Sequence, residues 1–187
     1  KAIHCSTDYV FGGRQQYIPF KEQDETAPLN KYGISKLKGE QIFLEISPKN
    51  LVFRVSWLYG EGRQNFIYKL LQWSQSRNEI LIANDEISVP TSTYFVAMNA
   101  LEALDANGLF HLVPDGYVSR YDYAKFVLNK LKVKSSIKPV PAEYFKLPAR
   151  RPNFSAMDSS LLFNLFNLEK KHWSEYVEEF LDEYKFE

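Results

Sequence analysis

Short apolar runs alternate with amphipathic runs along this chain, and that alternation constrains its fold more than any other feature. The strand-like runs are residues 2–5, 51–58, 80–83, 109–113 and 137–140. The helix-like runs are residues 32–46, 66–75, 94–104, 123–131, 159–166 and 172–184. Strands that alternate with helices predict an α/β fold with a mostly parallel sheet. Because 45% of the residues are hydrophobic, a core for one domain or parts of two is expected.

Local sequence signals predict helix caps, one irregular surface segment and one packing stripe. Ser119 and Asp122 predict a capping box before the run 123–131. Asn30 or Thr26 can cap the helix that contains "KYGISK". The proline-rich segment 138–152 also holds apolar residues, so we expect an ordered, irregular surface segment. In the last helix, aromatic residues at spacings of three and four residues predict a packing stripe made of Trp173, Tyr176, Phe180 and Tyr184.

The chemistry begins in "STDYVF", where a strand ends in the hydroxyl residues Ser6 and Thr7. Further on, "KYGISK" places Tyr32 and Lys36 four residues apart, on one face of a helix. A phenol has an unperturbed pKa near 10, and a nearby cation lowers it, so such a tyrosine can act as a general acid toward a carbonyl oxygen. A Tyr-x-x-x-Lys pair alone is more often a surface pair, but the upstream hydroxyls favour the catalytic interpretation.

These residues resemble the extended short-chain dehydrogenases, and within them the bacterial dTDP-4-dehydrorhamnose reductases. The motifs that carry the resemblance are "STDYVFGG", "APLNKYGISKLKGE", "LVFRVSWLYGEGRQNF", "DEISVPT", "GLFHL" and "ARRPNFS". They extend from Ser6 to Ser155 and so cover most of the chain. The combination is specific, whereas Tyr-x-x-x-Lys alone is not.

The resemblance implies an NAD(P)-binding, Rossmann-like, doubly wound parallel sheet. In such a fold the first strand leads into a glycine-rich turn that holds the cofactor pyrophosphate. This chain has no such motif, since its glycine pair Gly12-Gly13 opens no helix. We therefore expect only the C-terminal portion of the fold, plus a smaller α/β substrate-binding part. Residues 1–80 are assigned to the nucleotide-binding domain, and 81–187 mainly to the substrate-binding part, with some segments returning to the Rossmann core.

The resemblance also implies roles for individual residues. Thr7 matches the hydroxyl that binds the substrate carbonyl, Tyr32 matches the acid, and Lys36 matches the residue that lowers the tyrosine pKa and holds the nicotinamide ribose. NADPH or NADH then reduces the 4-keto group of dTDP-4-dehydro-L-rhamnose to give dTDP-L-rhamnose. The expected cofactor-binding residues are Ser6, Tyr32, Lys36, Val55 and Ser56. The expected residues for the dTDP-linked 4-keto-6-deoxysugar are Asp8, Tyr9, Val10, Trp57, Asn65, Arg150 and Arg151.

Some of these residues have a second interpretation. Asn65 precedes a helix and is either a plain N-cap or a substrate-contacting amide. Trp57 is more often a core residue, although its ring face suits a thymine or a sugar. Arg150 and Arg151 are either surface charges or partners of the substrate diphosphate, and we favour the latter for at least one of them. The histidines have no metal-ligand spacing, so no metal site is predicted.

Two departures from the family pattern leave other functions open. Gly12 replaces the usual Asp, and Glu86 replaces the usual Gln. The Glu86 carboxylate would be unfavourable beside a doubly anionic substrate if it pointed inward. The alternatives are another nucleotide-sugar 4-ketoreductase, an epimerase, or a non-catalytic subunit like the partner of methionine adenosyltransferase. The joint presence of Thr7, Tyr32 and Lys36 argues against the last.

Composition excludes other classes of protein. Lys plus Arg and Asp plus Glu both number 23, so a neutral chain offers no bulk attraction to nucleic acid or an anionic membrane. The single cysteine, Cys5, excludes an internal disulfide and favours a reducing cytoplasm. No apolar run approaches the roughly 20 residues needed to cross a bilayer. A homodimer is the expected assembly.

Overall fold

Three parallel strands in the order β1-β2-β7 form the central sheet of the structure, a computed structural model that describes residues 1–14 and 16–183. The strands are β1 (Ile3–Thr7), β2 (Leu51–Val55), β3 (Leu58–Tyr59), β4 (Glu79–Ala83), β5 (Ile87–Ser88), β6 (Thr91–Ser92), β7 (Gly108–His111), β8 (Val118–Ser119) and β9 (Ser136–Val140). The helices are α1 (Lys31–Ile46), α2 (Phe66–Ser76), α3 (Thr93–Glu102), α4 (Arg120–Lys130), α5 (Ser160–Leu165) and α6 (Trp173–Glu183), with short 3-10 helices η1 (Asp8–Val10) and η2 (Ala142–Phe145). The predicted α/β class and the mostly parallel sheet are confirmed.

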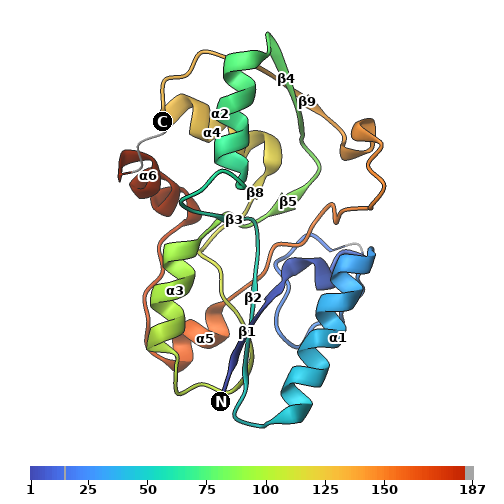
Figure 1. The fold of residues 1–187 in the computed structure, drawn as a ribbon, viewed down its shortest axis with the longest axis vertical. Coiled ribbons are helices and arrows are strands. Elements are labelled where there is room, and N and C mark those ends of the chain that lie inside the picture. The colour runs from blue at the N-terminus through green and yellow to red at the C-terminus, as the bar shows by residue number, and fades with distance from the viewer. Residues whose placement is uncertain (15, 184–187) are drawn as a thin grey trace.

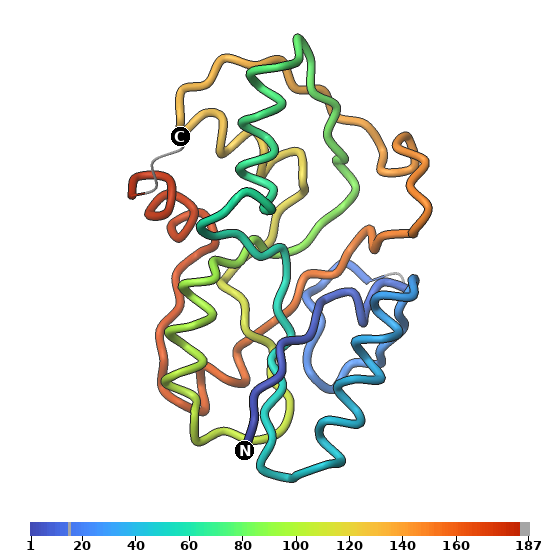
Figure 2. The backbone as a smooth tube through the Cα atoms, viewed as in Figure 1, coloured from blue at the N-terminus to red at the C-terminus, as the bar shows by residue number. Residues whose placement is uncertain are grey.

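Helix α1 lies on one side of the central sheet, and α3 and α5 lie on the other (Figure 1). In a second lobe, α2 and α4 pack on the parallel pair β4-β9, and α6 packs on α4. The chain passes between the two lobes several times, as the tube in Figure 2 shows. The assignment of residues 1–80 and 81–187 to two ligand-binding parts stays a prediction.

Strand register brings the polar ends of the sheet together. Thr7 pairs with Val55, and Arg54 pairs with His111, so the carboxyl ends of β1, β2 and β7 meet at one edge. The predicted single strand over 51–58 is wrong, because the chain leaves the sheet after Val55. Trp57 adopts a left-handed φ of 37°, and β3 then pairs with β6 instead. A strand cannot pass through a left-handed residue without a bend.

Two clusters of buried side chains hold these layers together. One surrounds β2, α3 and α5, and the other joins η1 to the second lobe through Tyr59, Tyr123 and Trp173. The predicted aromatic stripe of α6 is confirmed for its described members. Trp173, Tyr176 and Phe180 pack against Tyr123, Phe95 and Tyr59, with ring centroids 5.8, 4.9 and 5.3 Å apart. Tyr184, the fourth member, lies outside the described residues.

Helix caps largely follow the sequence signals. Ser119 caps α4 by accepting from the Asp122 N–H at 3.0 Å, and Asn30 rather than Thr26 caps α1 by accepting from the Gly33 N–H at 2.9 Å. Segment 138–152 is ordered and irregular, as predicted, and it contains the last residues of β9 and all of η2. Within the described residues, no helix is both long and apolar enough to cross a membrane.

A buried ion pair attaches α1 to the central strand. Arg54 on β2 donates to both carboxylate oxygens of Glu40 on α1, at 2.9 and 2.8 Å, and both side chains are buried. His111 is buried beside Arg54, and its two ring nitrogens lie within hydrogen-bond distance of Arg54 and of the Asp158 carbonyl oxygen. Burial and the adjacent Arg54 lower the pKa of His111 to about 3, so the imidazole adds no second positive charge to this core.

We predict that Glu40→Ala lowers the free energy of unfolding by about 3–5 kcal/mol, because Arg54 is left as an unpaired buried charge. Urea unfolding followed by circular dichroism measures this change. The control is Glu25→Ala, which removes an exposed ion pair with Arg14 and should leave stability nearly unchanged. Equal effects from the two variants would contradict the assignment of Glu40 as the anchor of α1.

Candidate active site

The close approach of helix α1 to the end of strand β1 builds the candidate site. Gly33 in the first turn of α1 lies against η1, where an added Cβ atom would lie 2.2 Å from the Tyr9 carbonyl oxygen. Only a residue without a side chain permits this contact. The rings of Tyr9 and Tyr32 meet edge to face, with centroids 5.9 Å apart. Tyr32 therefore lies beside the segment that follows Thr7, with 55% of its surface exposed.

Lys36 lies one turn further along α1 and points toward β1. Its ammonium group donates to the Cys5 carbonyl oxygen and lies 3.4 Å from His4 Nε2. Desolvation and the Lys36 charge lower the pKa of His4. A neutral His4 ring can accept a hydrogen bond from the lysine. The structure thus turns Tyr32 toward η1 and Lys36 toward β1, so both lie on the face of α1 that packs on this part of the chain.

The hydroxyl residues at the end of β1 have different surroundings. Thr7 Oγ1 accepts from the Tyr9 N–H at 3.2 Å and lies 3.2 Å from Asp8 Oδ1. Ser6 Oγ is buried and has no hydrogen-bond partner among the described residues. An unsatisfied buried hydroxyl is rare and needs an explanation such as a bound molecule. Burial raises the pKa of the Tyr9 phenol, and the nearby Asp8 carboxylate adds to this.

Other residues that the resemblance assigned to ligands are enclosed by protein. Val10 and Val55 are buried in the core, and the Ser56 hydroxyl donates to the Val89 carbonyl oxygen at 2.7 Å. Trp57 stacks on Tyr123, with ring centroids 6.4 Å apart. Their roles in binding a cofactor or substrate stay predictions, and packing accounts for the positions of all four side chains.

A cleft of about 510 Å³ opens in the second lobe, between α2, β4 and the segment that contains η2. Its aromatic lining residues are Phe66, Trp73 and Phe145. Its cationic lining residues are Lys69, Arg77, Arg120 and Arg151. Glu86 is the carboxylate among the described lining residues, so this wall of the protein carries an excess of positive charge in an otherwise neutral chain.

Glu86 points inward and lies between two arginines of this cleft. One of its carboxylate oxygens lies 3.5 Å from Arg120 Nε and 3.7 Å from Arg151 Nη1. Arg120 also stacks on Trp57, with its guanidinium carbon 3.7 Å from the ring centroid. Burial lowers the pKa of Arg120, and the Glu86 carboxylate opposes that effect. The two arginines compensate the inward carboxylate that looked unfavourable in the sequence.

Arg150 and Asn65 differ from Arg151 in their surroundings. Arg150 lines a neighbouring cleft, and its carbonyl oxygen accepts from the Asn30 side chain at 2.8 Å. Asn65 caps α2 by accepting from the Tyr68 N–H, while its amide donates to two backbone carbonyls. Both the amide oxygen and the amide nitrogen of Asn65 are therefore used by the backbone.

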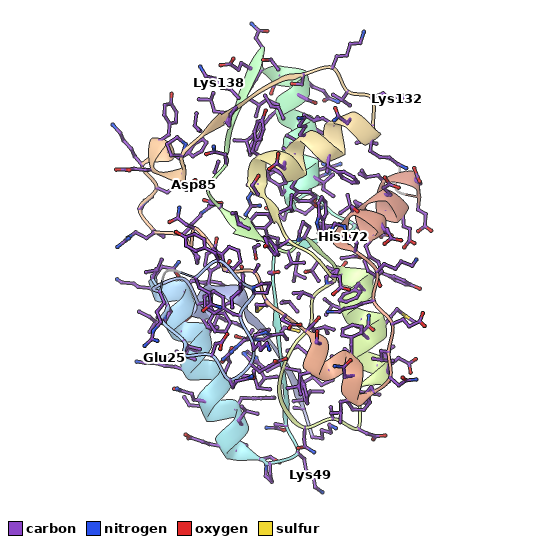
Figure 3. All side chains as sticks on the ribbon, turned by 180° about the vertical axis from the view of Figure 1, so that it is seen from behind. Glu25, Lys49, Asp85, Lys132, Lys138 and His172 are labelled. Atoms are coloured by element: carbon purple, nitrogen blue, oxygen red, sulfur yellow. The ribbon has the colours of Figure 1, made fainter. Side chains whose placement is uncertain are left out.

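Asp85 accepts a hydrogen bond from the Ala142 N–H and so anchors the segment that contains η2 (Figure 3).

Arg120 was missed in the sequence. It follows the N-cap Ser119, and a cation in the first turn of a helix opposes the helix dipole. A positive charge placed where it is locally unfavourable was the signal that a tertiary partner exists. Glu86, its partner, is 34 residues away in the chain (120 − 86).

The central sheet β1-β2-β7 is parallel, and α1, which carries Tyr32 and Lys36, packs on β1 and η1. The chain belongs to the RmlD substrate binding domain family, which matches residues 1–186. The dTDP-4-dehydrorhamnose reductase of Escherichia coli K12 is 36% identical over 194 residues, which cover 97% of this chain and 64% of that protein.

Solved structures agree with this family. The dTDP-4-dehydrorhamnose reductase of Clostridium acetobutylicum superposes with a TM-score of 0.90 at 32% identity, over 96% of this chain and 64% of that one. The Bacillus anthracis reductase, solved in complex with NADP, gives a TM-score of 0.89 at 32% identity, over 97% and 65%. This chain spans just under two thirds of the length of these relatives.

We predict opposite effects of two alanine substitutions in α1. Gly33→Ala should lower the free energy of unfolding and reduce the activity of the full-length gene product, because the new methyl group pushes α1 away from η1. Gly39→Ala should raise stability by about 0.4–1 kcal/mol, since its Cβ would meet only His4 Nε2 at 3.7 Å. Thermal or urea unfolding measures both. A stabilised Gly33→Ala variant would refute the close contact.

Proposed function

We propose that the full-length protein containing this chain reduces the 4-keto group of a dTDP-linked 4-keto-6-deoxysugar with NADPH or NADH, giving dTDP-L-rhamnose from dTDP-4-dehydro-L-rhamnose. The observation that carries the proposal is the packing of α1 on β1 and η1, with Tyr32 against Tyr9 and Lys36 against Cys5 on either side of Thr7 in the sequence. The similarity to reductases of known name supports the same reaction.

The residues present fit the nicotinamide end of such a cofactor. Ser6 offers a buried hydroxyl without a hydrogen-bond partner in the described part of the chain, and Lys36 offers an ammonium group that faces β1 at His4 and Cys5. When bound, the cofactor supplies a hydride to C4 of the sugar. Tyr32 then supplies the proton to the carbonyl oxygen, and Thr7 orients that oxygen by a hydrogen bond. Hydride and proton together convert the ketone to the alcohol, and solvent returns a proton to Tyr32.

The cleft beside α2 supports binding of the nucleotide diphosphate. Phosphate oxygens lose hydration in a cleft, and cations must offset this loss. Arg151 suits this role better than Arg150, because Arg151 lines the cationic cleft and keeps 42% of its side chain exposed there. The aromatic rings of Phe66 and Trp73 offer apolar faces to a base. A cytoplasmic location and a homodimer stay predictions.

We predict that Tyr32→Phe in the full-length gene product lowers kcat for reduction of dTDP-4-dehydro-L-rhamnose by about 10²–10⁴-fold, because the proton donor is lost. Oxidation of NADPH, followed by absorbance, measures the rate, and calorimetry with the dTDP-sugar should still show binding. The matched control is Tyr94→Phe, which removes a hydroxyl from a tyrosine that is 71% exposed on α3. Normal turnover in the Tyr32 variant would remove this residue from the mechanism.

We predict that Arg151→Ala raises the KM for the dTDP-sugar by roughly 10- to 100-fold, the size of one lost charge-assisted hydrogen bond of about 1.5–3 kcal/mol. Glu86→Gln should lower that KM, because the carboxylate no longer competes with phosphate for the arginines. The KM for the cofactor should stay the same in both.

Lys138→Ala provides the matched charge control, because Lys138 is exposed on β9, outside both clefts (Figure 3). If Arg151→Ala left the sugar-nucleotide KM at the control value while Arg150→Ala raised it, the diphosphate would belong to the neighbouring cleft.

A further inference from the structure

The buried carboxyl group of Asp8 contacts hydroxyl groups from three parts of the chain. Only 2% of the residue is exposed. Its Oδ2 atom accepts from Ser88 at 2.9 Å and from Ser155 at 2.6 Å, while its Oδ1 atom lies 3.2 Å from Thr7 Oγ1. Ser88 belongs to β5, and Ser155 follows the segment that contains Arg151. Asp8 is therefore enclosed by protein groups, and Thr7 is the proposed catalytic residue among its hydroxyl neighbours.

The direction of the Thr7 hydroxyl hydrogen determines whether Thr7 can donate to a substrate carbonyl. A hydroxyl has one hydrogen to donate and two lone pairs that accept. Thr7 Oγ1 already accepts from the Tyr9 N–H. If Asp8 is an ionised carboxylate, it only accepts, so the Thr7 hydrogen points at Asp8 Oδ1. A substrate carbonyl also only accepts, and the Thr7 hydrogen cannot serve both.

We propose that Asp8 is a positioning residue for Thr7 and that its neutral form is the working one. In that form the Asp8 Oδ1–H donates to Thr7 Oγ1, and the Thr7 hydrogen is directed toward the substrate carbonyl. Oδ2 remains the acceptor for Ser88 and Ser155. Every hydrogen then has an acceptor, and Thr7 uses both lone pairs and its one hydrogen. This proposal rests on the role proposed above for Thr7.

The surroundings of Asp8 support a neutral form. Burial raises the pKa of this carboxyl group, and the hydrogen bonds from Ser155, Ser88 and Thr7 oppose the rise. Arg120 on α4 is the charged group that acts on Asp8, and it also favours ionisation. Tyr9 on η1 is the other titratable neighbour, and it is neutral because burial raises the pKa of its phenol. The net direction for Asp8 is upward, which extends the neutral form to higher pH.

The test compares Asp8→Ala with Asp8→Asn in the full-length gene product. Asparagine reproduces the neutral acid: its carbonyl oxygen faces the two serine donors, and its NH₂ group donates to Thr7. Asp8→Ala should lose about 10²–10³ in kcat, as for a lost donor to a developing oxyanion, and Asp8→Asn should recover most of that loss. The wild-type rate should fall as pH rises through the Asp8 pKa, and this limb should be missing in Asp8→Asn.

Three results separate the possible failures. If Thr7→Val leaves kcat unchanged, the role of Thr7 in the proposed function is wrong, whatever Asp8 does. If Thr7→Val is inactive but Asp8→Asn is as poor as Asp8→Ala, a charged Asp8 is required and our proposal is overturned. Our proposal is also overturned if Asp8→Asn keeps the wild-type pH profile of kcat. Any dependence of kcat on pH that comes from other groups is common to both proteins.

A second measurement covers the case in which a variant does not fold. In wild-type protein labelled with ¹³C at aspartate carboxyl carbons, NMR follows the titration of Asp8 directly. We expect its midpoint to coincide with the pH limb of kcat. An Asp8 carboxyl that is ionised throughout the active pH range would overturn the proposal without any substitution.

Discussion

Glu40 and Arg54 join helix α1 to the central strand β2 through two hydrogen bonds in the core of the protein. Tyr32 and Lys36 both lie on α1, so their position relative to β1 depends on how this helix sits on the sheet. The ion pair holds the middle of α1, and Gly33 lets its first turn touch η1. A buried pair is retained only when both charges are satisfied, so the anchor tolerates little change.

Two further buried carboxyl groups, those of Asp8 and Glu86, connect the central sheet to the second lobe. Asp8 joins the end of β1 to β5 and to the segment near Ser155, and Glu86 joins Arg120 on α4 to Arg151. In a neutral chain, local cations such as Arg120 and Arg151, rather than a diffuse field, must organise an anionic ligand.

The longer helices and strands were largely predictable from apolar runs and helix caps, whereas the two-residue strands β3, β5, β6 and β8 were not predicted. The run 51–58 was predicted wrongly, because its apolar residues continue past the point at which the backbone turns at Trp57. Arg120 was also missed, because its partner Glu86 is distant in the sequence and only their packing brings them together. Burial likewise could not be read from "STDYVF" and "KYGISK", which gave no sign that Asp8 is enclosed and Tyr32 exposed.

The amino-acid sequence by itself determined the alternating α/β pattern, the spacing of Tyr32 and Lys36, the hydroxyl pair at the end of β1 and the family resemblance. These are local or linear properties, and the period of a helix is enough to place two residues on one face. The tertiary structure alone decided which side chains meet: Asp8 with two serines, Glu86 with two arginines, and Gly33 with the Tyr9 carbonyl. Such contacts join residues that are distant along the chain, and their geometry depends on packing that no local pattern encodes.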